Sequence, residues 1–233
     1  MATDPGMLQS WYADYQKDNG TASTTAAPAA APAPTGKTSP VQGLQERFTF
    51  ETFVPGPANE FAHAVARRIA NWADGHFNPV LFHGPYGFGK THLLNALAWE
   101  AMRNAPEKRV VYLTAERFLS TFVRALMDRQ TAAFKEELRA ADLLIIDDFL
   151  TVSIDPEAGN DLFAILANRN ERLATIIASQ TGPAHWVDAL PDRVAADSIV
   201  DRLAHHARRI ELGGIDMRKA CHDQTRTSEQ FWE

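Results

Sequence analysis

The sequence predicts an α/β fold, a three-layer sandwich in which helices cover both faces of a parallel five-stranded sheet, preceded by a disordered tail. Strand-like and helix-like segments alternate from about Gln45 onward, which is the pattern of βα units. The strand candidates are short apolar runs without polar alternation, as expected for strands buried on both faces. One of them, Val80–His83, leads directly into a glycine-rich loop and a helix. Ligands of such sheets bind at the carboxyl ends of the strands.

Each element is predicted from the spacing of its apolar residues. The strand candidates are Val80–His83, Val110–Thr114, Leu143–Asp147, Thr175–Ser179 and Arg209–Leu212. The helix candidates are Asn59–Asp74, Lys90–Arg103, Ala115–Met127, Thr131–Ala140, Glu157–Leu173 and Arg193–His205. Together they predict one domain over residues 45–219, followed by a C-terminal tail, residues 220–233.

The N-terminal part has a different composition. From Gly20 to Val41 nearly every residue is Ala, Pro, Thr, Ser or Gly, and Lys37 is the only charge. Such a segment buries too little apolar surface to offset an ordering cost of about 1–2 kcal/mol per residue. We therefore expect residues 1–44 to consist of a short helix remnant, around Met7–Tyr15, and a disordered linker.

The composition argues against several classes of protein. A formal net charge of −6 over 233 residues disfavours bulk electrostatic binding of nucleic acid, so a DNA contact requires a local basic patch. The single cysteine, Cys221, rules out an internal disulfide framework. No apolar stretch approaches the roughly 20 residues of a membrane span, and the N-terminus lacks a signal sequence. We expect a soluble, cytoplasmic protein without a membrane partner.

The strongest motif is the loop after the first strand. Its spacing matches G-x-x-x-x-G-K-[ST], in which backbone N–H groups and a helix N-terminus surround the phosphates of ATP. Lys90 would reach the β- and γ-phosphates, and Thr91 would ligate Mg²⁺. An ordinary glycine turn is the weaker alternative, because the flanking strand and helix are also present. The expected ATP contacts are Gly84, Pro85, Tyr86, Gly87, Phe88, Gly89, Lys90, Thr91 and His92.

Two later strands end in polar residues that complete such a site. The apolar run Leu143–Ile146 ends in Asp147, which would hold Mg²⁺ through its water shell, and Asp148, the candidate general base for an attacking water. The strand after it ends in Ser179 and Gln180, which either sense the γ-phosphate or belong to an ordinary turn.

These motifs lie within a wider resemblance to a known family. The segments Phe48–Ala62, Phe77–Pro79, Gly84–Leu94, Val110–Phe118 and Phe134–Lys135 resemble the AAA+ core of DnaA, the bacterial replication initiator. This resemblance spans about residues 45–148 and implies an AAA+ fold of the ASCE P-loop class. It also implies that Phe53, Val54 and Asn59 pack around the adenine.

From Phe149 onward the sequence resembles IstB, a transposition helper ATPase, and the related helicase loaders. The segments that carry this likeness are Ile154–Glu157, Ile177–Gln180, Asp197–Ala207 and Met217–Lys219. All of these families share one AAA+ architecture, so the expected fold is the same for both halves.

The departures from DnaA concern DNA binding and catalysis. DnaA carries basic residues after the acid pair that help to hold single-stranded DNA, whereas Phe149–Asp155 contains none. Val123 and Lys135 remain as the DNA-binding candidates. The resemblance assigns Arg202 to the active site of a neighbouring subunit, while His206 stands where the family has a further arginine.

Two charged groups near the end of the chain have competing interpretations. His205, His206 and His222 lack a matching carboxylate set, which favours helix-surface residues over a metal site. The cations near the end of the fold fit an inter-subunit contact and a DNA contact equally well, and ordinary solvated charge is the third interpretation. They are Arg202, Arg208, Arg209, Arg218 and Lys219.

These observations predict a weak ATPase that binds Mg·ATP, with Lys90, Asp148 and Arg202 as the catalytic residues. It would use ATP to self-assemble on single-stranded DNA, weakly bound, in bacterial replication initiation. One alternative is a transposition helper or helicase loader, whose partner is a transposase or replicative helicase. Another is a nucleotide-binding regulator of a full-length initiator.

Overall fold

The structure is a computed structural model and describes residues 43–73, 78–151, 156–169, 172–180, 182–186 and 207–213. All of these lie in one of the chain's two units, Val41–Glu233. The predicted linker, the helix candidate Arg193–His205 and the C-terminal tail lie outside the described residues. None of the described helices is long and apolar enough to cross a membrane.

Five parallel strands form a single sheet in the order β2-β3-β4-β1-β5. They are β1 (Val80–His83), β2 (Val110–Thr114), β3 (Leu143–Asp147), β4 (Ala174–Ser179) and β5 (Arg208–Glu211). Because all neighbours are parallel, their carboxyl ends share one edge, where the glycine loop and the acid pair both begin. The β4 strand separates β1 from β3, so its end lies between these two motifs.

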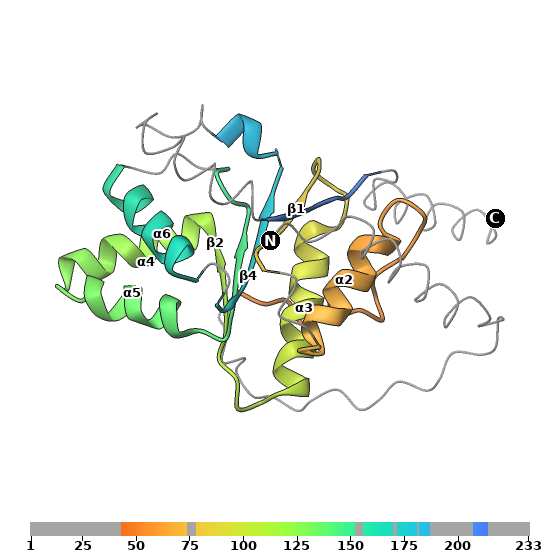
Figure 1. Ribbon diagram of the computed structural model, residues 1–233, viewed down its shortest axis with the longest axis horizontal. Helices are drawn as coiled ribbons and strands as arrows, with labels where there is room; N and C mark the ends of the chain where they lie inside the picture. Colours follow the sequence, from red (N-terminus) through yellow and green to blue (C-terminus); the bar gives the residue numbers. More distant parts are fainter. Residues whose placement is uncertain are drawn as a thin grey trace, which may run out of the picture. The chain divides into compact units, whose positions relative to one another are not determined.

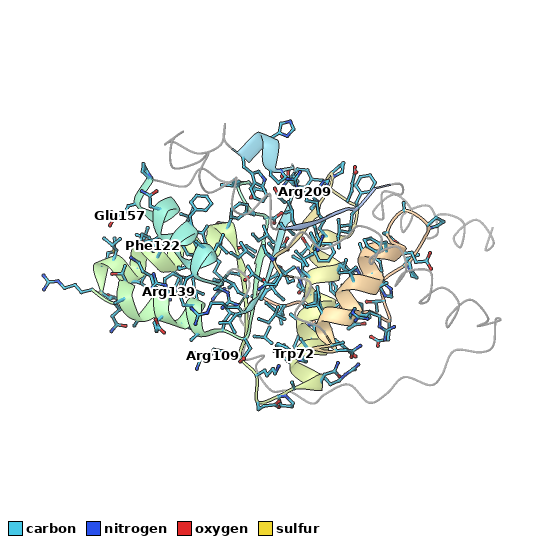
Figure 2. All side chains as sticks on the ribbon, in the orientation of Figure 1. Trp72, Arg109, Phe122, Arg139, Glu157 and Arg209 are labelled. Carbon is cyan, nitrogen blue, oxygen red and sulfur yellow. The ribbon has the colours of Figure 1, made fainter. Side chains whose placement is uncertain are left out.

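Helices cover both faces of the sheet, as predicted (Figure 1). On one face lie α2 (Glu60–Ala70) and α3 (Lys90–Asn104), and on the other lie α4 (Ala115–Met127), α5 (Thr131–Ala140) and α6 (Pro156–Arg169). A short 3₁₀ helix, η1 (Pro183–His185), follows β4. Figure 2 shows Phe122 in the α4–α6 layer and Trp72 in the opposite layer.

The core on the α4–α6 side is rich in aromatic residues. Phe118 stacks on Phe122 with ring centroids 5.9 Å apart, and Phe134 of α5 packs 5.8 Å from Phe118. Phe149 meets Trp186 edge to face at 4.8 Å. Full burial of each phenylalanine contributes about 1.5–3 kcal/mol. This layer therefore anchors the segment that directly follows the acid pair.

Some predicted element ends differ from the structure. The helix predicted over Asn59–Asp74 ends at Ala70, because Trp72 adopts a left-handed φ of 56° and its indole N–H donates to Ala101 O of α3 at 3.1 Å. The helix predicted to reach Leu173 ends at Arg169, whose side chain turns into the interior. The predicted start at Ala115 is correct, since Thr114 caps it by accepting the Arg117 N–H.

Candidate nucleotide-binding site

The glycine loop between β1 and α3 has backbone angles that favour glycine. Gly87 and Gly89 have φ values of 88° and 85°, in the left-handed region that costs other residues energy. Gly84 has φ 153°, and a Cβ there would lie 2.2 Å from Leu212 O, directly after β5. Glycine at position 84 is thus required by the close approach of a neighbouring segment as well as by the turn.

The loop holds a buried positive charge. Lys90, the first residue of α3, is 7% exposed, and its Nζ donates to Gly84 O at 2.6 Å and to Pro85 O at 2.8 Å. The N–H groups of the first turn of α3 point out of the helix toward the loop, as they do at every helix N-terminus. An ammonium and a helix N-terminus at one loop fit a phosphate group.

The predicted magnesium ligands are in contact. Asp147, at the end of β3, is fully buried, and the Thr91 side chain of α3 lies close enough to its carboxyl to favour the charged form and lower its pKa. Burial, followed by the nearby charge of Asp148, raises the pKa of Asp147 above its ordinary range. A divalent cation would offset both effects, so the two oxygen ligands and the local charge fit Mg²⁺.

Protein side chains alone do not form a complete metal site here. Within the described ranges there is no group of three or more His, Cys, Asp and Glu side chains that would hold a metal ion. Magnesium usually takes one or two protein ligands and completes its shell with water and phosphate oxygens. Thr91 and Asp147 match that mode. The histidines His205, His206 and His222 lie outside the described residues.

The backbone turns sharply after Asp147. Asp148 and Leu150 have left-handed φ values of 53° and 57°, and the Phe149 N–H donates to Ala178 O of β4 at 2.8 Å. Asp148 is half-buried beside Asp147. This strained turn keeps the candidate general base next to the candidate metal ligand.

The structure separates the two polar residues at the end of β4. Ser179 is buried, and its hydroxyl donates to Phe149 O at 3.1 Å and accepts from the Trp186 indole N–H at 3.2 Å. Gln180 has a buried amide nitrogen that meets no hydrogen-bond acceptor among the described residues. The Gly84 N–H donates to Ser179 O, which brings Gln180 next to the loop. Gln180 is therefore the better candidate for a phosphate contact.

The predicted adenine residues lie around an aromatic cluster. Phe53 is buried and stacks on His63 with centroids 5.4 Å apart, while His92 meets it edge to face at 5.3 Å. Asn59 is also buried, and it acts on the backbone: it accepts the Gly56 N–H at 2.7 Å and donates to Val54 O at 3.2 Å.

Two of the side chains predicted to contact the nucleotide are exposed to solvent. Val54 is 52% exposed, and Tyr86 of the glycine loop is 63% exposed. His92 is tied to the N-terminal segment, because its Nε2 donates to Thr49 O at 2.9 Å. The residues predicted to surround a nucleotide thus come from three segments that meet at the start of α3.

Two of the remaining candidates lie on the α4–α6 side of the sheet. Val123 on α4 is 45% exposed, and Lys135 on α5 forms an ion pair with Asp161 of α6 at 2.6 Å. Arg202 lies outside the described residues. Tyr112, which donates to Asp147, and Asn95, which donates to Thr91 O, were not among the site residues predicted from the sequence. A buried Asn inside a helix is a usable signal, since Asn disfavours helix interiors.

The fold and the site together define a class. A parallel sheet with β4 between the glycine-loop strand and the acidic strand, a Lys-Thr pair at the loop and Asp147 facing Thr91 characterise an AAA+ P-loop nucleoside triphosphatase. Residues 44–198 match the family of the bacterial DnaA ATPase domain, and the chain belongs to this family.

Relatives by sequence are chromosomal replication initiator proteins. DnaA of Caulobacter vibrioides is 84% identical over 134 residues, which is 58% of this chain and 27% of that protein. DnaA of Cereibacter sphaeroides is 37% identical over 177 residues, or 72% of this chain and 38% of the relative. The chain thus spans between about a quarter and two fifths of the length of these relatives.

Solved structures share the fold. AMPPCP-bound DnaA from Aquifex aeolicus is 28% identical with a TM-score of 0.64, over 76% of this chain and 53% of that one. Domain III of DnaA from Thermotoga maritima is 28% identical with a TM-score of 0.65, over 80% of this chain and 76% of that one. A structure of DnaI supports the fold alone. It is 20% identical with a TM-score of 0.62, over 72% of this chain and 92% of that one. The likeness to IstB stays a prediction.

Proposed function

We propose that this domain binds Mg·ATP at the glycine loop, hydrolyses it slowly and uses the bound nucleotide to assemble on single-stranded DNA during replication initiation. The contact between Thr91 and Asp147 beside the buried Lys90 carries the proposal. This contact brings together the glycine loop and the acid pair at the end of β3, the two parts of the proposed Mg·ATP site, which are far apart in the sequence.

The relatives support the biological setting. The sequence relatives are named chromosomal replication initiator proteins. One structure is a replication initiator DnaA bound to AMPPCP and single-stranded DNA, 28% identical with a TM-score of 0.64, over 74% of this chain and 52% of that one. We extend nucleotide and DNA binding from that protein to this chain.

Each residue has a defined part in this proposal. Lys90 exchanges its two carbonyl partners for the β- and γ-phosphates, and Gln180 donates its free amide N–H to the γ-phosphate. Thr91 and Asp147 hold Mg²⁺, which neutralises phosphate charge when bound. Asp148 accepts a proton from the attacking water. Catalysis of this kind depends mainly on positioning and on charge stabilisation.

The base would lie beside the aromatic cluster. Val54 and Tyr86 offer exposed apolar surface there. Phe53, next to Val54 in the sequence, packs edge to face on His92, and Asn59 fixes the loop that carries Val54. Val123 and Lys135 are the proposed contacts to single-stranded DNA.

Thermal unfolding with and without Mg·ATP tests the proposal. At a ligand concentration 100-fold above the dissociation constant, binding should stabilise the fold by about 2.7 kcal/mol. Lys90→Ala should remove most of this gain. Lys108→Ala is the matched control, because Lys108 lies over the Trp72 ring at 4.0 Å, at a different place in the fold. An unchanged nucleotide-dependent shift in Lys90→Ala would sink the assignment.

A further inference from the structure

A buried asparagine in α3 contacts the backbone of a candidate metal ligand. Asn95 is fully buried one turn after Thr91, and its Nδ2 donates to Thr91 O at 2.8 Å and to the Tyr112 hydroxyl at 3.2 Å. Its Oδ1 accepts the Gln45 N–H at 2.8 Å. A backbone N–H can only donate, so this contact fixes which end of the amide is the oxygen.

Asn95 is linked to the acid pair by a chain of hydrogen bonds that passes through Tyr112, in the middle of β2. Its side chain is buried, and its hydroxyl has one proton. Because the hydroxyl oxygen accepts from Asn95, that proton is directed to Asp147 Oδ2, 2.8 Å away. The hydrogen bonds therefore run in one direction, from Gln45 through Asn95 and Tyr112 to Asp147.

The carboxylate at the end of this chain is held at both oxygens. Asp147 Oδ1 accepts the Asp148 N–H at 2.9 Å while Oδ2 accepts from Tyr112. Two fixed donors define the plane of a carboxylate that would otherwise rotate. The Thr91 hydroxyl meets the same carboxylate, and its own backbone is tied to Asn95.

We propose that Tyr112 and Asn95 are positioning residues that hold Asp147 and Thr91 in the mutual arrangement that Mg²⁺ requires. The proposal rests on the Mg·ATP function proposed above. Residues that orient metal ligands through hydrogen bonds typically change metal affinity by about 10–100-fold when they are mutated. The chain of hydrogen bonds begins at Gln45, whose carbonyl oxygen also accepts from Trp99 Nε1 at 3.2 Å. The segment entering the domain thereby supports the metal site.

The test measures ADP affinity of the full chain across a range of free Mg²⁺ concentrations. Tyr112→Phe removes one hydroxyl and keeps the ring in place. It should raise the Mg²⁺ concentration at half effect by about 10-fold, while ADP affinity in EDTA stays within about twofold of the wild type. Asn95→Ala should shift the Mg²⁺ midpoint in the same direction.

Thr175→Val is the matched control. It removes another buried hydroxyl, which accepts from Arg169 Nε at 3.1 Å at the opposite end of the sheet. It should lower stability and leave the Mg²⁺ midpoint unchanged.

A Mg²⁺ midpoint in Tyr112→Phe within twofold of the wild type would overturn the inference. An equal shift of the midpoint in Thr175→Val would also overturn it. If the ADP affinity of the wild type does not depend on Mg²⁺, the proposed function itself is wrong. If Asn95→Ala does not fold, the Mg²⁺ midpoint of Tyr112→Phe by itself tests the inference.

Discussion

Lys135 Nζ of α5 lies 2.6 Å from Asp161 Oδ2 of α6. The side chains are 25% and 23% exposed, so the pair is partly shielded from solvent. Lys135 is one of the two proposed DNA contacts, and a phosphate would have to compete with Asp161 for its charge. We therefore expect the ion pair, while it is formed, to weaken the proposed DNA binding.

Asp161→Asn should strengthen binding to single-stranded DNA several-fold, because it releases Lys135. Each phosphate contact on a single strand contributes about 0.7 to the slope of log affinity against log salt, so the slope should steepen by up to that amount. Lys135→Glu should make it shallower by less than one unit. Fluorescence anisotropy with an oligonucleotide at several salt concentrations measures both. Glu136→Gln makes the same charge change at an exposed site on α5 and serves as the control. An equal gain in Glu136→Gln would show a general charge effect.

Arg169→Lys should destabilise the domain by about 3 kcal/mol, which corresponds to about 6–12 °C in Tm. The Arg169 guanidinium is fully buried, and burial lowers its pKa to about 10. It caps the end of α5 by donating to Leu138 O at 2.8 Å and Ala141 O at 2.6 Å, and it also donates to Ala174 O at 2.7 Å. A lysine ammonium lacks the planar fork for these contacts.

Urea unfolding gives the free energy for this comparison. Arg124→Lys, at an exposed position of α4, should change stability by no more than about 0.5 kcal/mol. Equal stability of Arg169→Lys and the wild type would refute the capping role.

Stability should fall as the pH drops below about 6.5, and His63→Gln should reduce this fall. Burial, reinforced by the charge of Arg67, lowers the pKa of His63 below its ordinary value of 6.5. In that range the unfolded state binds more protons than the folded state, so the free energy of unfolding decreases with falling pH. Burial also lowers the pKa of His83 and His92, so both contribute to the same loss of stability at low pH.

Unfolding free energies at pH 7, 6 and 5 measure this effect. His185→Gln, at an exposed position of η1, is the control and should retain the wild-type slope. An unchanged slope in His63→Gln would assign the pH dependence to other groups.

ATP hydrolysis per subunit should rise with protein concentration, because the family resemblance places Arg202 in a neighbour's site. An arginine supplied in trans is worth about 10³–10⁵ in rate, and His206 at the family's other arginine position favours the low end. Mixing Lys90→Ala with Arg202→Ala should restore part of the activity that each variant lacks. Turnover strictly proportional to protein concentration, with no recovery in the mixture, would exclude a shared site.

The sequence by itself determined the elements whose signals are local. The runs Val80–His83 and Leu143–Asp147 are strands as predicted, since a continuous apolar run specifies a strand buried on both faces. The glycine loop was predictable because its function requires particular residues at fixed spacing. The order of the strands was not predicted from the sequence; the structure shows β4 between β1 and β3.

The tertiary structure decided what each polar side chain contacts. Ser179 looked equivalent to Gln180 in the sequence, but Phe149 and Trp186 engage its hydroxyl. Tyr112 read as an ordinary strand residue until its partner Asp147, 35 positions away, was in place. Hydrogen bonds between distant segments depend on which strands are neighbours and on how far each helix extends. Local periodicity carries no information about such contacts, so the hydrogen bonds behind the proposed metal site were visible only in the fold.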